Sequence, residues 1–126
     1  MAKLCSTFVL AAACTIIRDN VSRITINTGT PPTSTLAETT SIGTATASAA
    51  SFTLGDSSLT GKKLDVIAFT NIPCPTSTGT AGTLCLISTG ATGVIYWQTT
   101  FAEQLVASTA NLINTSTFII RISDAT

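Results

Sequence analysis

The residues that most often carry catalysis are scarce in this sequence. The chain of 126 residues contains no histidine, which removes serine–histidine and cysteine–histidine catalysis and most zinc sites. Its carboxylates are scattered over different segments: Asp19, Glu38, Asp56, Asp65, Glu103 and Asp124. Two of them could in principle serve glycoside hydrolysis, but Asp56 follows a glycine in a turn-forming run, where a carboxylate usually stabilises the turn. We therefore expect no enzymatic activity.

Cofactor and small-molecule sites are also not indicated. No glycine-rich stretch ends in Lys-Ser or Lys-Thr, so the sequence lacks a phosphate-binding loop. Tyr96-Trp97 could stack a sugar or a base. Neighbouring residues of a strand face opposite sides, so we favour packing of one ring in the core. We expect no cofactor, no metal and no small-molecule substrate.

The four cysteines raise one question of pairing. Cys5 and Cys14 are nine residues apart, so on a helix they point to opposite sides and cannot pair. Cys74 and Cys85 flank Gly79-Thr80 symmetrically, and a regular hairpin would place them opposite each other, where a disulfide is possible. The alternative, which we prefer, is that both stay reduced and are buried as small hydrophobic side chains.

The longest run without turn-forming residues is Leu4 to Ile17, LCSTFVLAAACTII. With Lys3 before it, the run fits an export signal. Ala11-Ala12-Ala13-Cys14 resembles a lipoprotein processing site, although Ala11 stands where a larger aliphatic residue is usual. The run is shorter than the about 20 apolar residues that cross a bilayer. We expect a retained helix over residues 4–19.

Apolar residues surround most of this expected helix. One stripe consists of Leu4, Phe8, Ala11, Ala12, Thr15 and Ile16, and it is widened by Cys5, Val9, Ala13, Ile17, Leu10 and Cys14. A helix with so wide an apolar surface must be covered on more than one side, which a small domain rarely achieves alone. Two interpretations stay open: the helix lies wholly in its own core, or a neighbouring subunit shares it.

After residue 20 the sequence favours short strands. Alternating or β-branched segments occupy residues 21–27, 51–54, 62–70, 72–75, 83–88, 94–99, 105–106, 112–113 and 118–122. Pro31 and Pro32 predict an extended loop over residues 28–33, and residues 36–51 allow a thin strand near 42–47. Strands at intervals of about ten residues predict an antiparallel, jelly-roll-like β-sandwich. We expect one domain, 1–126, with the sandwich at 21–126.

The chain carries little charge. Lys and Arg balance Asp and Glu at six each, and charged residues make up 10% of the sequence, against about 25% in typical proteins. No net field attracts nucleic acid or a membrane surface, and a weakly charged apolar surface promotes association. We expect binding to copies of itself or to a protein partner, and no direct binding to nucleic acid or membranes.

The order of these segments resembles a family of small virion structural proteins of tailed bacteriophages. The resemblance covers nearly the whole chain, through LCSTFVLAAACTIIRDN, RITINTGTPP, GTATASAASFTLGDSSLTGKKLDV, STGTAGTLCLIS and FIIRISDAT. These segments correspond to an Ala-rich helix, a strand before proline, a Phe strand with an Asp turn, a Gly-x-Ala hairpin and a closing Ile-rich strand. The chain departs from the family pattern at Pro73, Cys74, Pro75 and Cys85.

The resemblance implies a non-enzymatic capsid decoration or cement protein. Such a protein would be made in the host cytoplasm and would bind the major capsid protein and copies of itself on the capsid surface. The alternatives are a neck, tail or fibre component, or a bacterial surface lipoprotein or adhesin subunit. The expected contact surfaces are Leu4 to Ile17, Thr28 to Leu36 and Thr39 to Ser51. The residues expected to make contact are Leu4, Phe8, Leu10, Ile17, Pro31, Pro32, Leu36 and Ile42.

Overall fold

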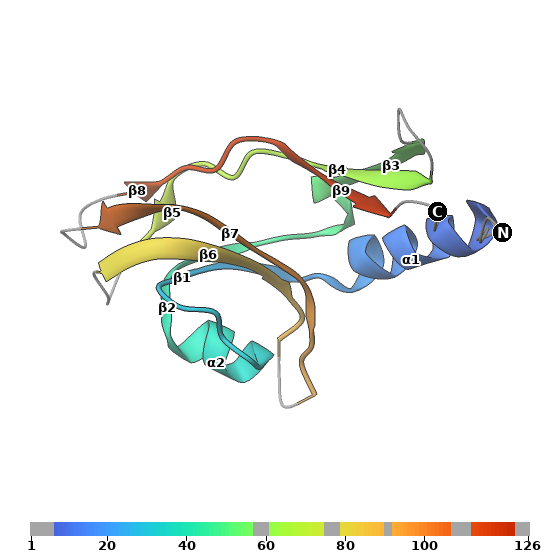
Figure 1. The fold of residues 1–126 in the computed structure, drawn as a ribbon. Coiled ribbons are helices and arrows are strands. Elements are labelled where there is room, and N and C mark those ends of the chain that lie inside the picture. Colours follow the sequence, from blue (N-terminus) through green and yellow to red (C-terminus); the bar gives the residue numbers. More distant parts are fainter. Residues whose placement is uncertain (1–6, 57–60, 75–78, 90–91, 107–111, 123–126) are drawn as a thin grey trace, which may run out of the picture.

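The computed structural model describes residues 7–56, 61–74, 79–89, 92–106 and 112–122, and the side chains of residues 7 and 102–106 are outside this description. The chain is mainly β, with antiparallel sheets and an N-terminal helix, as the sequence predicts (Figure 1). In chain order the elements are α1 (Thr7–Asn20), β1 (Arg23–Asn27), α2 (Ser34–Thr39), β2 (Ser41–Thr46), the 3-10 helix η1 (Ala49–Ser51), β3 (Phe52–Asp56), β4 (Lys62–Val66), β5 (Ile72–Pro73), β6 (Gly79–Ile87), β7 (Ile95–Val106), β8 (Leu112–Ile113) and β9 (Phe118–Ile122).

The described strands form three antiparallel sheets. The largest has the strand order β2-β1-β6-β7, the second β3-β4-β9, and the third consists of β5 and β8. Figure 1 shows the second sheet lying over the first, with α1 beyond the end of the first sheet and beneath β3, β4 and β9. The face of the second sheet that points inward is therefore covered partly by strands and partly by α1.

One hydrophobic core joins these layers. Ile24 and Ile26 of β1 pack in the same buried cluster as Leu64 of β4, Ile120 of β9 and Ile17 of α1. Because successive strand residues face opposite sides, Ile24 and Ile26, two residues apart on β1, point together toward the second sheet. The result is a two-layer, sandwich-like arrangement that the helix completes at one end.

Two aromatic rings connect the layers. Trp97 of β7 stacks on Phe118 of β9, with ring centroids 5.2 Å apart and planes inclined by 15°. Tyr96 also packs against the core cluster. The sequence predicts one ring of Tyr96-Trp97 in the core, whereas both rings are partly buried and both pack against the core cluster.

The helix α1 ends where its last turn is capped. The Asn20 side chain donates to the carbonyl oxygen of Ile16 at 2.8 Å, and the Val21 amide donates to the carbonyl of Ile17 at 3.1 Å. These bonds satisfy carbonyls that a helix end otherwise leaves unpaired. The sequence places the end at residue 19, one residue earlier, and its expected first turn lies outside the described residues.

A short helix, α2, was not predicted. Thr33 caps it, because its Oγ1 accepts from the Leu36 amide at 3.2 Å. From β1, Asn27 donates to the carbonyl of Ala37 at 3.0 Å and to Thr40 Oγ1 at 3.2 Å. These buried bonds hold α2 against the side of the first sheet that faces away from the core, where Ala37 packs near Cys85 and Ile87.

The predicted hairpin that would place Cys74 opposite Cys85 is wrong. Ile72–Pro73 pairs with Leu112–Ile113 instead, and β6 lies between β1 and β7. Both hydrogen-bonding edges of β6 are therefore occupied, by β1 and β7, which are longer strands than residues 72–75 could form. In addition, Pro73 and Pro75 have no amide hydrogen to donate to a neighbouring strand.

Two predicted strands have different lengths in the structure. The strand predicted over residues 62–70 ends at Val66, because Phe69 exchanges hydrogen bonds with Thr115, at 3.0 Å through Thr115 Oγ1 and 2.8 Å between the backbones. The segments 94–99 and 105–106 belong to the single strand β7, which pairs with β6 through two register shifts.

Candidate interaction surface

The helix α1 has two apolar sides, of which one is buried and the other exposed. Leu10, Cys14 and Ile17 are 5%, 0% and 9% exposed and face the core. Phe8, Val9 and Ile16 are 81%, 53% and 53% exposed, and Ala12 between them is also exposed. Since residues four apart share a helix face, Phe8, Val9, Ala12 and Ile16 form one apolar strip, which we call the outer face of α1.

The outer face carries no charge along its length. Among the described residues of α1, the charged side chains lie at its C-terminal end, where Arg18 Nε and Asp19 Oδ1 form an ion pair at 2.8 Å. Hydrogen bonding from Arg18 lowers the pKa of Asp19. The outer face is therefore suited to contact with another apolar surface rather than with a charged one.

A second apolar spot lies beside α2. Pro31, Pro32 and Leu36 line a shallow depression of about 220 Å³ together with Gly29, Thr30 and Thr40. Leu36 is 42% exposed, Pro32 is exposed and Pro31 is buried. The structure thus brings together three residues that the sequence places on one contact loop, and we call this spot the proline depression.

The other residues expected to make contact have different positions. Leu10, Ile17 and Ile42 are buried in the core, the last with 3% of its surface exposed, so none of them is available on the surface of the folded chain. Leu4 lies outside the described residues. Val9, Ala12 and Ile16 lie within the expected contact surface Leu4 to Ile17 but were not singled out, because helical periodicity does not reveal which apolar side faces the core.

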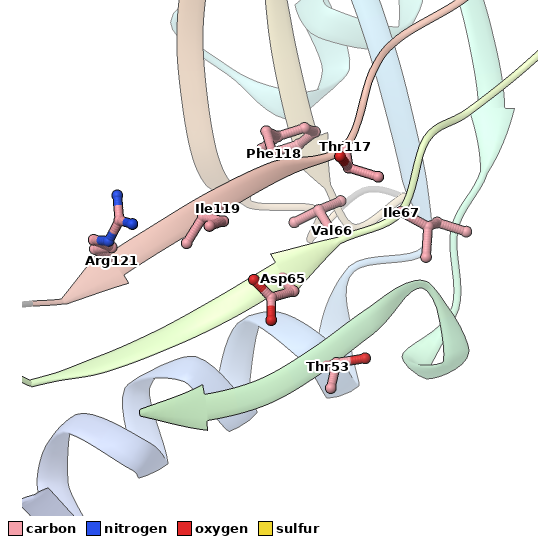
Figure 2. Close-up of a pocket in the computed structure, with 8 residues that line it drawn as sticks. All are labelled: Thr53, Asp65, Val66, Ile67, Thr117, Phe118, Ile119 and Arg121. Atoms are coloured by element: carbon pink, nitrogen blue, oxygen red, sulfur yellow. The ribbon is translucent and has the colours of Figure 1, made fainter. Parts of the chain in front are cut away.

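The outer side of the second sheet holds a wider depression. Figure 2 shows its lining residues on three strands and the segments that flank them: Thr53, Asp65, Val66, Ile67, Thr117, Phe118, Ile119 and Arg121. Its only carboxylate, Asp65, pairs with Lys63 at 3.4 Å. A face with one ion-paired carboxylate and alternating polar and apolar residues has the composition of an ordinary solvated sheet.

The carboxylates with described side chains are all ion-paired. Each of the four with a described side chain has its own cation: Asp19 with Arg18, Glu38 with Arg23, Asp56 with Lys62 and Asp65 with Lys63. The described part of the chain also holds no group of three residues suited to bind a metal ion.

The buried thiols are unreactive in character. Cys14, Cys74 and Cys85 are free and buried, and burial raises the pKa of each above the usual thiol value of 9.0. A thiol that stays protonated is a poor nucleophile and a poor metal ligand.

Within the described residues, no helix has both the length and the apolar character needed to cross a membrane.

The thiols lead to a pH prediction. We expect iodoacetamide at pH 7.5 to label these three cysteines only after unfolding. We also expect the free energy of unfolding to fall above pH 9, because unfolded thiols ionise there while buried thiols still hold their protons. Urea titrations between pH 7.5 and 10 measure this, and Cys85→Ala should show a shallower fall. Labelling of the native protein as fast as that of the unfolded protein would contradict the prediction.

Comparison with protein-family models, with curated proteins and with solved structures finds no match to this chain. Function must therefore be inferred from the residues and surfaces described above.

Proposed function

We propose that this protein is a non-enzymatic structural subunit of a virion, a decoration or cement protein bound to the major capsid protein on the outside of the capsid. The observation that carries the proposal is that apolar side chains of the folded chain stay exposed at the outer face of α1 and in the proline depression. Clustered exposed apolar residues mark association surfaces. The resemblance to virion proteins of tailed bacteriophages is the reason for proposing a virion as the place where this surface binds.

The mechanism is burial of apolar surface rather than chemistry. Each contact contributes about 25 cal/mol for every Å² of apolar surface removed from water, so a small spot such as the proline depression binds weakly alone. Repetition over a capsid lattice multiplies weak contacts through avidity. The low charge of the chain, 10% of its residues, limits repulsion between subunits packed at high density.

The proposal is tested with virions that lack this protein, prepared from the genome that encodes it. Labelled protein should bind them saturably at the multiplicity of the capsid lattice. Leu36→Glu, which places a charge at the proline depression, should weaken binding at least about tenfold, since a desolvated charge costs more than 1.4 kcal/mol. Ile67→Glu is the matched control, because Ile67 is 46% exposed on the opposite layer, and it should bind normally.

The outcomes separate the alternatives. Binding at the low multiplicity of a neck or tail would replace the capsid role with a neck, tail or fibre role. Wild-type protein that binds no part of the virion would contradict a virion function altogether. Equal binding by the Leu36 and Ile67 variants would exclude the proline depression as the capsid contact.

A further inference from the structure

We draw no further inference here: the strongest candidate, the exposed apolar outer face of α1 formed by Phe8, Val9, Ala12 and Ile16, carries nothing, because nothing in the structure shows what covers it.

Discussion

Ile17→Asp is expected to destroy the stable fold, whereas Ile16→Asp is expected to leave it intact. The two isoleucines are neighbours of identical chemistry, but Ile17 is 9% exposed within the core cluster and Ile16 is 53% exposed. Burying a carboxylate in place of Ile17 should cost more than about 4 kcal/mol, from lost packing and lost hydration. That is a large part of the about 5–15 kcal/mol that holds a domain folded.

Urea unfolding followed by circular dichroism measures this difference. Ile16→Asp should change the free energy of unfolding by less than about 1 kcal/mol. Equal losses at the two positions would show that both sides of α1 are covered within one chain, and would contradict the assignment of the outer face.

Trp97→Ala is expected to cause the second large loss of stability, about 2–4 kcal/mol. The ring links β7 to β9 through its stack on Phe118, at a centroid distance of 5.2 Å, so its removal weakens the contact between the two large sheets. Phe101→Ala on the same strand is the matched control, since Phe101 is 38% exposed, and it should cost less.

A double-mutant cycle isolates the stack itself. Trp97→Ala, Phe118→Ala and the combined variant should give a coupling of about 0.5–1.5 kcal/mol in urea unfolding. Strictly additive losses would mean that the two rings contribute only independent burial.

Deleting the N-terminal helix would not distinguish a lost contact from a lost fold. Removing residues 1–17 would take away Leu10, Cys14 and Ile17, which are part of the core. Loss of attachment after such a deletion would therefore reflect unfolding as much as a missing contact. Single substitutions on the outer face separate these two effects.

The sequence predicts the general architecture because its patterns are local. The apolar run before residue 18 has the composition of a helix, and the alternation at residues 23–27 and 118–122 marks strands. The strand at 23–27 is nevertheless buried on both faces, because α2 covers the side that faces away from the core. The division of α1 into a core side and an outer face could not be predicted, since both sides are apolar. Only the position of β3, β4 and β9 over the helix decides it.

The pairing of distant strands could not be predicted from local sequence patterns either. The symmetry of Cys74 and Cys85 about a glycine predicts a hairpin, but β6 pairs with β1 far back in the sequence. The helix α2 is specified by a tertiary contact as much as by its own residues, because Asn27 on β1 binds Ala37 and Thr40. Of its local signals, the cap at Thr33 is the one that sequence inspection could have found.

A density map of purified virions from the genome that encodes this chain tests the proposed role most directly. We expect the two-sheet domain on the outside of the capsid at lattice multiplicity, with the proline depression against the coat protein. Absence of the chain from the virion, or a position confined to the neck or tail, would contradict the capsid role.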